Sequence, residues 1–526
     1  MENNEAPEKI NENSGSPEIK KELTQNSLQQ EAGNNTNAVN RINETNIQPN
    51  EVSDTKTDVK QNGNLPFIDQ YDRKLFNNSR SLAVKILIRC ERTDAYLDKL
   101  IDSEIKQSEL NDLDKALLNE LSHGVIRWMR RLDWFLNGFY RGQYEKCLPD
   151  VKNAMRVALY QILFLNKIPY AAAVNEAVEF IKNIRGDRHA GVVNGLLRTI
   201  IRTLDSLVWP TREIDEVNYL GIIQSHPNWL VRRWIGRFGF DEAEKLCEAN
   251  NKRPSLTMRL NRTKVNAVEF EKYLNEKNIL FQKGKYLDYF YSTKMMSRIY
   301  DDDFFKKGFF TIQDESAGLV AHLAAPKENE LIIDVCAAPG GKSSHISELT
   351  NNKAKLISVD KYLSKVEMLK QNFERLGLRQ NMLVFHEDIN EPKTGLMREK
   401  LIGKADKVIA DVPCSGFGVL SKKPDIKWKR DSEDIQKLQK IQLEIILKSA
   451  AYVKPGGALI YSTCTTEKEE NIDVVNIFLK KNENFHIDDA SKFVSSDVVN
   501  TSGCIEVFPH KHGIDGSFSA RLVRDS

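Results

Sequence analysis

The chain changes its hydrophobic period at about residue 311. From Arg80 to about Asp205 apolar residues recur at spacings of three and four with few glycines. Examples are the runs SLAVKILIRC, ALLNELSHGVIRWMRRLDWFL and AMRVALYQILFL. This spacing predicts an all-α domain, because it places the apolar residues on one face of each helix. Residues 207–216 (LVWPTREIDE) then predict a linker or long turn around Trp209 and Pro210.

From about Thr311, short apolar runs alternate with helical stretches. The predicted strands are ELIIDVCA, KLISVD, MLVFHED, KVIADVP and ALIYSTC. Alternation of this kind predicts an α/β domain with a parallel sheet that is covered on both faces. Ligands of such sheets bind at the carboxyl ends of the strands. The residues at these ends are Asp334, Cys336, Asp360, Asp388, Asp411, Cys414 and Cys464.

The intervening segment, about 217–310, mixes helix and strand patterns. It opens with SHPNWLVRRWIGRFG, which predicts a helix capped by Asn228, and continues with the strand-like RPSLTMRLNRTK. Arginines alternate with Trp229 and Trp234 in the helix. Two interpretations carry equal weight: stacking and phosphate contacts with RNA, or packing of the tryptophans into a core with the arginines outside.

Residues 1–66 are polar and contain no aromatic residue. Such a segment cannot bury enough apolar surface to offset its chain entropy, so it is predicted to be a disordered tail. The predicted organisation is therefore a tail (1–66), a helical domain (67–212), a small α+β region (213–310) and an α/β domain (311–526). The tail holds eleven acids and six bases, so the total charge of +2 leaves +7 for the remainder. That excess fits a nucleic-acid partner without proving one.

Several classes of protein are excluded by composition. No apolar run approaches the roughly 20 residues of a membrane span, and the acidic, proline-containing first residues do not form a signal peptide. We therefore expect a cytoplasmic protein that does not bind membranes. The seven cysteines contain no CxxC pair, which argues against a zinc ribbon or a disulfide framework.

A glycine-containing stretch, DVCAAPGGKSSHISEL, lies between the first predicted strand and a helix. Glycine allows a ligand to approach the backbone closely, and a helix N-terminus offers N–H donors. A P-loop would need glycine at the position of Cys336, and the dinucleotide fingerprint GxGxxG is absent. Asp360 and Asp388 end the next two predicted strands, where they can accept hydrogen bonds from a ribose and neighbouring polar groups. Together these features predict a nucleoside pocket.

Three motifs of the α/β segment, one of them the glycine-containing stretch, resemble those of the RNA cytosine-C5 methyltransferases. They are DVCAAPGGKS, DVPCSGFGVLSKKPDIKW and YSTCT with the acidic helix after it. The runs AAAVNEAVEFIK and VVNGLLRTI resemble the NusB RNA-binding fold, and SHPNWLVRRW, LTMRLN and FTIQDESAGL resemble the middle segment of the same enzymes. A NusB-like domain joined to this catalytic domain is the arrangement of the RsmB-type 16S ribosomal RNA methyltransferases.

This resemblance implies a multidomain protein with a NusB-like all-α domain, a small α+β RNA-contacting region and a Rossmann-like methyltransferase domain. It implies S-adenosylmethionine as the methyl donor, no metal, and 16S ribosomal RNA as the partner before the subunit is fully assembled. Within the family the chain looks like the cytosine-967 enzyme. A monomer is favoured over an oligomer.

The two cysteines at strand ends are not separated by periodicity alone. The Pro-Cys motif of DNA cytosine methyltransferases would make Cys414 the nucleophile. In the RNA family that the chain resembles, the Thr-Cys cysteine attacks carbon 6 of the base, which here is Cys464, and Cys414 assists product release. Asp411 would then contact the base. The predicted cofactor-binding residues are Cys336, Ala337, Ala338, Pro339, Gly340, Gly341, Lys342, Asp360, Asp388 and Asp411.

Two other sequence features bear on the substrate. The loop after the Pro-Cys motif is basic, and we expect it to contact the RNA backbone; its residues are Lys422, Lys423, Lys427, Trp428, Lys429 and Arg430. Near the C-terminus, Ser517 stands where the family's DGFF-like run has an aromatic residue. The alternatives are the same chemistry on transfer RNA or another ribosomal RNA site, and a non-catalytic RNA-binding factor.

Overall fold

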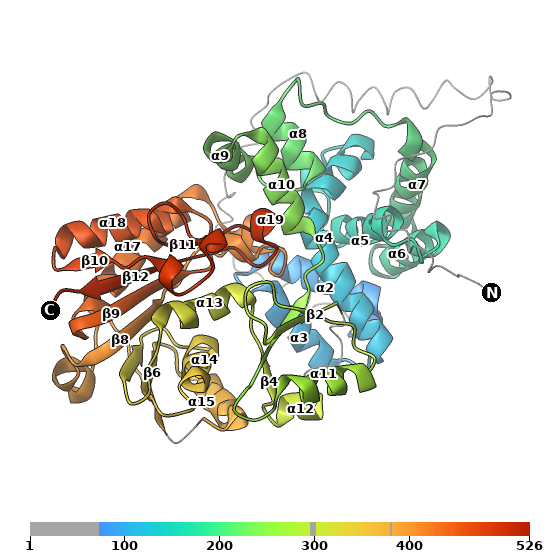
Figure 1. Cartoon of the computed structure of the whole chain (residues 1–526). Helices are drawn as coiled ribbons and strands as arrows, with labels where there is room; N and C mark the ends of the chain where they lie inside the picture. The colour runs from blue at the N-terminus through green and yellow to red at the C-terminus, as the bar shows by residue number, and fades with distance from the viewer. Residues whose placement is uncertain (1–72, 295–300, 379–380) are drawn as a thin grey trace, which may run out of the picture.

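The computed structural model describes residues 73–294, 301–378 and 381–526. The predicted tail, 1–66, lies outside the described residues, and the predicted domain boundaries remain predictions. Figure 1 shows helices α5, α6 and α7 on one side of the molecule and the large sheet with α17 and α18 on the other. Among the described residues, no helix is long and apolar enough to cross a membrane.

The N-terminal part of the described chain is helical throughout, as predicted. Its helices are α2 (Ser79–Arg92), α3 (Leu97–Gln107), α4 (Asp112–Phe139), α5 (Pro149–Phe164), α6 (Tyr170–Arg185) and α7 (Asp187–Thr203). Their apolar faces share one core, in which residues such as Ile86, Leu121 and Leu159 are buried. The predicted linker is fixed to this core, because Trp209 stacks on Trp134 with ring centroids 5.1 Å apart.

The middle region consists of a helical part and a small sheet. Helices α8 (Glu216–Ile223), α9 (Asn228–Phe238) and α10 (Phe240–Asn251) come first. The antiparallel sheet has the order β2-β3-β1-β4, with β1 (Leu256–Leu260), β2 (Gln282–Lys283), β3 (Phe290–Thr293) and β4 (Phe310–Ile312). Helices α11 (Ala267–Glu276) and α12 (Asp303–Lys306) lie between its strands in the chain. The prediction that Asn228 caps α9 was wrong, since Pro227 holds the cap position and Asn228 is the first helical residue.

The five predicted strands of the α/β segment form the parallel part of a larger sheet. They are β5 (Leu331–Asp334), β6 (Lys355–Asp360), β7 (Met382–His386), β8 (Ala405–Asp411) and β9 (Val453–Thr463). The sheet order is β10-β12-β9-β8-β5-β6-β7, with β11 paired to β12. Strands β10 (Phe485–Ile487), β11 (Ile505–Val507) and β12 (Ser517–Arg524) pair antiparallel. The sheet is therefore mixed, and the expectation of a purely parallel sheet was wrong at this edge.

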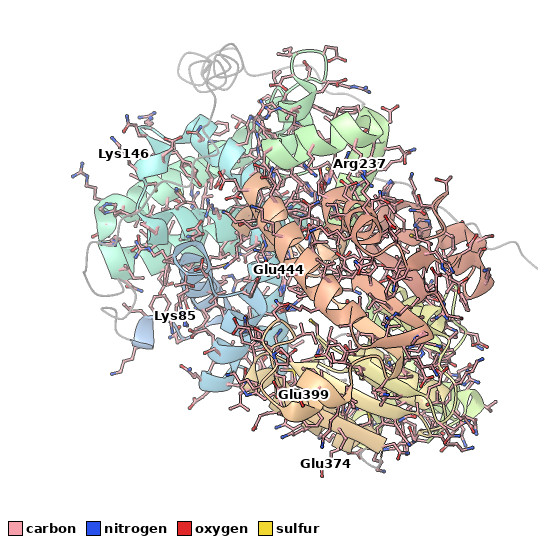
Figure 2. All side chains as sticks on the ribbon, turned by 90° about the vertical axis from the view of Figure 1, so that its left-hand side faces the viewer. Lys85, Lys146, Arg237, Glu374, Glu399 and Glu444 are labelled. Carbon is pink, nitrogen blue, oxygen red and sulfur yellow. The ribbon has the colours of Figure 1, made fainter. Side chains whose placement is uncertain are left out.

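Helices cover both faces of the large sheet. Helices α13 (Glu315–Ala324), α14 (Gly341–Leu349) and α15 (Leu363–Leu376) bury one face, against side chains such as Ile332 and Ile460. Helices α17 (Ser432–Ala450) and α18 (Ile472–Lys481) bury the other, against Ile333 and Leu459. Neighbouring strand residues thus point to opposite faces, as alternation in a strand requires. In Figure 2 the long helix α17, labelled at Glu444, faces the viewer.

Candidate active site

Two cysteines that are 50 residues apart in sequence meet at the carboxyl ends of β8 and β9. The strands are parallel neighbours, with Asp411 opposite Ser462, so the residues that follow them lie side by side. The Sγ atoms of Cys414 and Cys464 are 3.1 Å apart, and the Cys464 amide donates to the Cys414 sulfur at 3.3 Å. Cys464 is exposed and Cys414 is half-buried. The predicted convergence of both thiols at this edge is present in the structure.

The loops that carry the two cysteines are bonded to each other. The Gly418 amide donates to the Cys464 carbonyl at 3.0 Å, and the Gly516 amide donates to the Gly418 carbonyl at 2.8 Å. A Cβ on Gly418 would lie 2.0 Å from the Gly516 oxygen, so only glycine fits there. The Ser415 amide also donates to Glu470 at 2.8 Å. The separation of the sulfurs is thereby fixed by backbone contacts on both sides.

The electrostatic surroundings distinguish the two thiols. The hydrogen bond with Cys464, together with burial, raises the pKa of Cys414 well above its ordinary value. Burial, the largest single cause, works to lower the pKa of Lys342. The charge and hydrogen bond of Asp411, together with smaller contributions from Cys464 and Asp334, outweigh burial and raise this pKa. Lys342 is therefore a cation close to Cys464, while Cys414 keeps its proton.

Asp411 lies between these groups at the end of β8. Its Oδ2 accepts a hydrogen bond from Lys342 Nζ at 2.6 Å, and its Oδ1 accepts one from Ser462 Oγ at 3.1 Å. About a third of the side chain (32%) is exposed, so the carboxylate can still reach a ligand. Beneath it, burial raises the pKa of Asp334 to about 7, opposed by a hydrogen bond from Ser343 and assisted by the charge of Asp411.

The predicted cofactor loop connects β5 to α14 and begins at Cys336. Burial raises the pKa of the Cys336 thiol, which makes it a neutral packing group. The loop is held by neighbouring strands, since the Ala337 amide donates to the Val359 carbonyl at 2.9 Å and the Ala338 amide to Asp360 at 3.3 Å. Gly340 has φ +100°, which side chains rarely adopt, and no side chain caps α14.

The two acids predicted to contact the nucleoside lie on this side of the sheet. Asp360 ends β6, is buried, and also accepts a hydrogen bond from the Tyr362 amide at 3.0 Å. Asp388 lies two residues beyond the end of β7 and forms an ion pair of 2.9 Å with Lys361. Burial alone would raise the pKa of Asp388, but the bond from Lys361 lowers it. Asp360 is thus built into the loop, whereas Asp388 is partly exposed.

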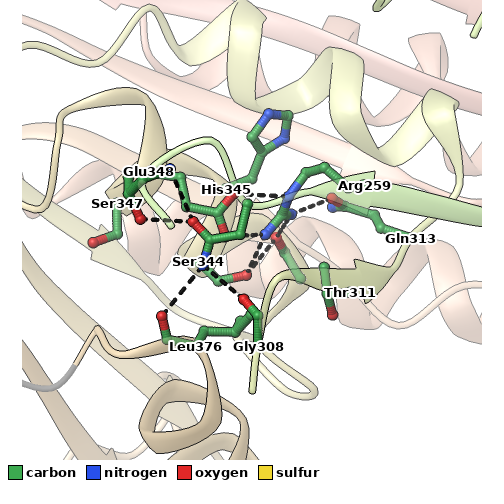
Figure 3. A network of polar contacts seen from close by, with 12 residues as sticks. Arg259, Gly308, Thr311, Gln313, Ser344, His345, Ser347, Glu348 and Leu376 are labelled. Carbon is green, nitrogen blue, oxygen red and sulfur yellow. Dashed lines mark hydrogen bonds and ion pairs between the residues drawn. The ribbon is translucent and has the colours of Figure 1, made fainter. Parts of the chain in front are cut away.

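A residue that the sequence reasoning missed supports the cofactor loop from the small sheet. Arg259 of β1 is fully buried and donates to Glu348 at 2.7 and 3.1 Å, to the Gly341 carbonyl at 2.8 Å, to Ser344 at 3.0 Å, and to Gln313. Figure 3 shows its guanidinium between Gln313 and Glu348. The only sequence signal was an arginine within the apolar run LTMRL, and its acidic partner lies 89 residues away.

The basic loop after the Pro-Cys motif contacts protein at most of its residues. Lys422 is bonded to Asp314 and Asp515, and Lys427 and Lys429 donate to backbone carbonyls of the helical domain. Trp428 donates from Nε1 to the Ile126 carbonyl at 2.8 Å. Lys427 is only 1% exposed, so the prediction of an RNA contact was wrong for this residue. The other five residues of the loop are half-buried or exposed, and for them RNA contact stays a prediction.

The tryptophan-arginine helix, α9, also packs within the protein. Trp234 is fully buried and donates from Nε1 to Glu467 at 3.0 Å, and Trp229 lies edge-on to Phe417 at 5.9 Å. Arg233 is bonded to Glu467 and Glu469. Of the two interpretations that carried equal weight, packing is correct for these residues. Arg232 alone in this group is exposed.

Comparisons with known proteins place the chain in a family. The family model described as 16S rRNA methyltransferase RsmB/F matches residues 321–523. The NusB family matches 77–202, and a ferredoxin-like domain of RsmF/B-like methyltransferases matches 226–289. A probable ribosomal RNA small subunit methyltransferase B of Bacillus subtilis is 37% identical over 448 residues, which cover 84% of this chain and 97% of the relative. The chain belongs to the ribosomal RNA small subunit methyltransferase B family.

Other relatives agree with this assignment. The ribosomal RNA small subunit methyltransferase B of Cronobacter sakazakii is 31% identical over 85% of this chain and 99% of its own length. The solved structure titled PH0851 has a TM-score of 0.70 at 24% identity, covering 84% of this chain and 98% of its own, which shows a shared fold. NSun6 from Pyrococcus horikoshii with SFG has a TM-score of 0.51 at 21% identity, covering 58% of this chain and 100% of its own.

Family membership confirms the predicted class of enzyme. The protein is an S-adenosylmethionine-dependent ribosomal RNA cytosine-C5 methyltransferase. The predicted combination of a NusB-like all-α domain, a small α+β region and a Rossmann-like methyltransferase domain is also confirmed. The alternative of a non-catalytic RNA-binding factor is thereby excluded.

Proposed function

We propose that Cys464 is the nucleophile that adds to carbon 6 of the target cytosine, and that Cys414 assists release of the methylated product. The observation that carries this proposal is the pair of sulfurs 3.1 Å apart, of which Cys464 is exposed and Cys414 keeps its proton. A thiolate is the reactive form of cysteine. The ammonium of Lys342 lies close enough to Cys464 to interact with it electrostatically.

The proposed steps use only groups at this edge of the sheet. Carbon 5 of cytosine is a poor nucleophile, and addition of Cys464 to carbon 6 turns carbons 4 and 5 and the exocyclic amine on carbon 4 into an enamine, whose carbon 5 can attack an electrophilic methyl group. Asp411 would hydrogen-bond N3 or the exocyclic amine and so stabilise the protonated ring during addition. After the methyl group is on carbon 5, the carbon 5 proton is lost to solvent water, the bond between carbon 6 and sulfur breaks, and the Cys464 thiolate is expelled. Cys414, which keeps its proton and whose sulfur lies 3.1 Å from that of Cys464, can protonate the departing thiolate.

The loop of residues 336–342 would hold S-adenosylmethionine, together with Asp360 and Asp388. When bound, this group supplies an electrophilic methyl on a sulfonium. The donor set fits it: backbone N–H groups at the start of α14 can meet a carboxylate, and acids after β6 and β7 can accept from ribose and amino groups. Lys342, the cation in this loop, is already paired with Asp411, which suits a ligand without a phosphate chain.

We further propose that the target is a cytosine of 16S ribosomal RNA, the nucleotide 967 of the resemblance, modified before the subunit is fully assembled. The names of the curated relatives support a small-subunit target. A base attacked on its ring must leave its stack, which favours a single-stranded or loop site that later assembly would cover. The protein is proposed to act as a monomer in the cytoplasm.

The experiment that tests the function is methyl transfer to RNA. The full chain is incubated with S-adenosylmethionine labelled in its methyl group and with deproteinised 16S RNA, and the nucleosides are then analysed. We expect 5-methylcytosine at one position, and loss of label with Cys464→Ala. Transfer only to transfer RNA would favour the alternative substrate. Absence of transfer to any ribosomal or transfer RNA, by protein with an intact thermal unfolding transition, would overturn the proposal.

A further inference from the structure

Helix α4 of the helical domain contains a kink, and backbone carbonyls beside this kink accept hydrogen bonds from another part of the chain. Trp128 has φ −106° and ψ 15°, which is outside the helical region. At this point the Arg130 amide donates to the Ser225 hydroxyl at 3.1 Å. The carbonyls of Ile126 and Arg127, just before the kink, accept hydrogen bonds from outside the helix. Kinks have such local causes, because the regular ladder of helix hydrogen bonds is interrupted there.

The donors to this kink come from the loop that follows Cys414. Lys427 Nζ donates to the Arg127 carbonyl at 2.9 Å, and Trp428 Nε1 donates to the Ile126 carbonyl at 2.8 Å. In the opposite direction, Arg127 Nη2 donates to the Ser421 carbonyl at 2.7 Å. About 300 residues of sequence separate the two sides. The loop and the kink therefore satisfy each other's polar groups.

Burial of the Lys427 amine at this contact carries a large desolvation free energy. Only 1% of the residue is exposed, and its acceptors are neutral: the Arg127 carbonyl and, at 3.4 Å, Asn251 Oδ1. Burial, reinforced by the charge of Arg127, lowers the pKa of Lys427 well below its ordinary value. An apolar side chain of similar volume would pack there without this desolvation cost. The lysine is thus better explained by what it holds in place than by stability.

The segment between Cys414 and Lys427 transmits the position of the kink to the active site. Phe417 and Leu420 are buried in one cluster with Trp234 of α9, and Gly418 is bonded to the Cys464 carbonyl. The loop is consequently fixed at one end by the Cys464 backbone and at the other by the helical domain. A displacement of the backbone at the kink would move Cys414, because the closely packed side chains of the loop cannot absorb it.

We propose that Lys427 and Trp428 are positioning residues through which the helical domain holds Cys414 against Cys464. The NusB-like domain would then be required for release of the product as well as for binding RNA. This inference rests on the roles proposed above for the two cysteines. It predicts a defect in release, while the first methyl transfer, which needs Cys464 and Asp411, is retained.

The test uses full-length variants that each remove one contact. Trp428→Phe keeps an aromatic ring and loses the N–H donor to Ile126, and Lys427→Met removes the amine. Lys437→Met is the matched control, because this lysine lies on α17 with its side chain 62% exposed and pairs with Glu433 of the same helix. Each protein is given S-adenosylmethionine and 16S RNA. The fraction of protein covalently attached to RNA is read on a denaturing gel, alongside first-turnover and multiple-turnover methylation.

We expect Lys427→Met and Trp428→Phe to accumulate the adduct as Cys414→Ala does. Their multiple turnover should slow by about fivefold to tenfold, the equivalent of losing one buried hydrogen bond. First-turnover transfer should stay within about twofold of wild type, and Lys437→Met should match wild type. If Lys427→Met does not fold, Trp428→Phe alone decides.

Two results would overturn the inference, and they differ in what else they remove. Release at the wild-type rate by both variants, with accumulation by Cys414→Ala, would refute the positioning role and leave the proposed function standing. If Cys414→Ala itself releases its product normally, the proposed role of Cys414 and the inference both fail.

Discussion

The buried ion pair between Arg259 and Glu348 provides a sharp test of how the cofactor loop is supported. The side chains are 0% and 5% exposed, and Arg259 donates to both carboxylate oxygens. Replacing Arg259 with methionine leaves a buried carboxylate without its cation. Breaking a buried pair from one side costs about 3–5 kcal/mol, whereas replacing both partners by apolar residues is often neutral. Arg259→Met should therefore lower the free energy of unfolding by about 3–5 kcal/mol.

The pH dependence of this loss follows from Glu348. Burial raises the pKa of Glu348, and the charge of Arg259 opposes that rise. Without Arg259 the pKa in the folded state climbs further above the unfolded value. The Glu348 carboxyl then binds its proton more tightly in the folded protein than in the unfolded chain. Stability therefore falls as the pH rises from the pKa of Glu348 in the unfolded chain to its higher pKa in the folded protein. The loss caused by Arg259→Met should accordingly be larger at pH 8 than at pH 5.5.

The assay is urea unfolding followed by circular dichroism at both pH values, with three variants. Arg259→Met should be strongly destabilised, Glu348→Gln less so because its amide still accepts from Arg259, and the double variant Arg259→Met with Glu348→Met should recover most of the loss. A loss below about 1 kcal/mol for Arg259→Met, equal at both pH values, would refute the reasoning, because it would mean that the carboxylate is not desolvated in the folded state.

Three further predictions concern the active-site edge. Gly418→Ala should reduce kcat at least about 100-fold, since its Cβ would lie 2.0 Å from the Gly516 carbonyl, whereas Gly236→Ala, with open space, should leave kcat unchanged; steady-state methylation compares them. Burial raises the pKa of Asp515 to about 7, so its contribution to stability is lost as the pH rises to that value. Asp515→Asn should flatten the fall in Tm between about pH 4 and 7, and an unchanged pH profile would contradict this. Asp411→Asn should slow single-turnover methylation by about 100-fold or more in protein that is still folded at the assay temperature; a normal rate would remove its proposed contact with the base.

The parts of the fold that the sequence predicted are those governed by local periodicity. The helical domain and the five parallel strands follow from the spacing of apolar residues, and the convergence of Cys414 and Cys464 follows because parallel strands end at one edge. The antiparallel edge was missed. Strands β10 and β11 have only three residues each and carry little periodic signal, and the eight-residue β12 was not recognised as a strand.

The contacts that could not be predicted are those between distant segments. The sequence predicts that Lys427 and Trp428 are exposed residues of a basic loop. In the structure they donate hydrogen bonds to backbone carbonyls at a helix kink about 300 residues earlier. Backbone carbonyls leave no signature in a sequence. Arg259 similarly depends on Glu348, 89 residues away, and neither residue is unusual in its local run. Charge patterns predict surfaces only when the fold leaves those charges exposed.

The account depends most on which sulfur attacks the base, and one measurement decides it. Wild-type enzyme is incubated with S-adenosylmethionine and 16S RNA that contains 5-fluorocytosine, whose fluorine blocks loss of the group on carbon 5 and so traps the adduct. The adduct is digested, and the cysteine that carries the nucleotide is identified by tandem mass spectrometry. We predict that the nucleotide is attached to Cys464. Attachment to Cys414 would contradict the account and exchange the roles of the two residues.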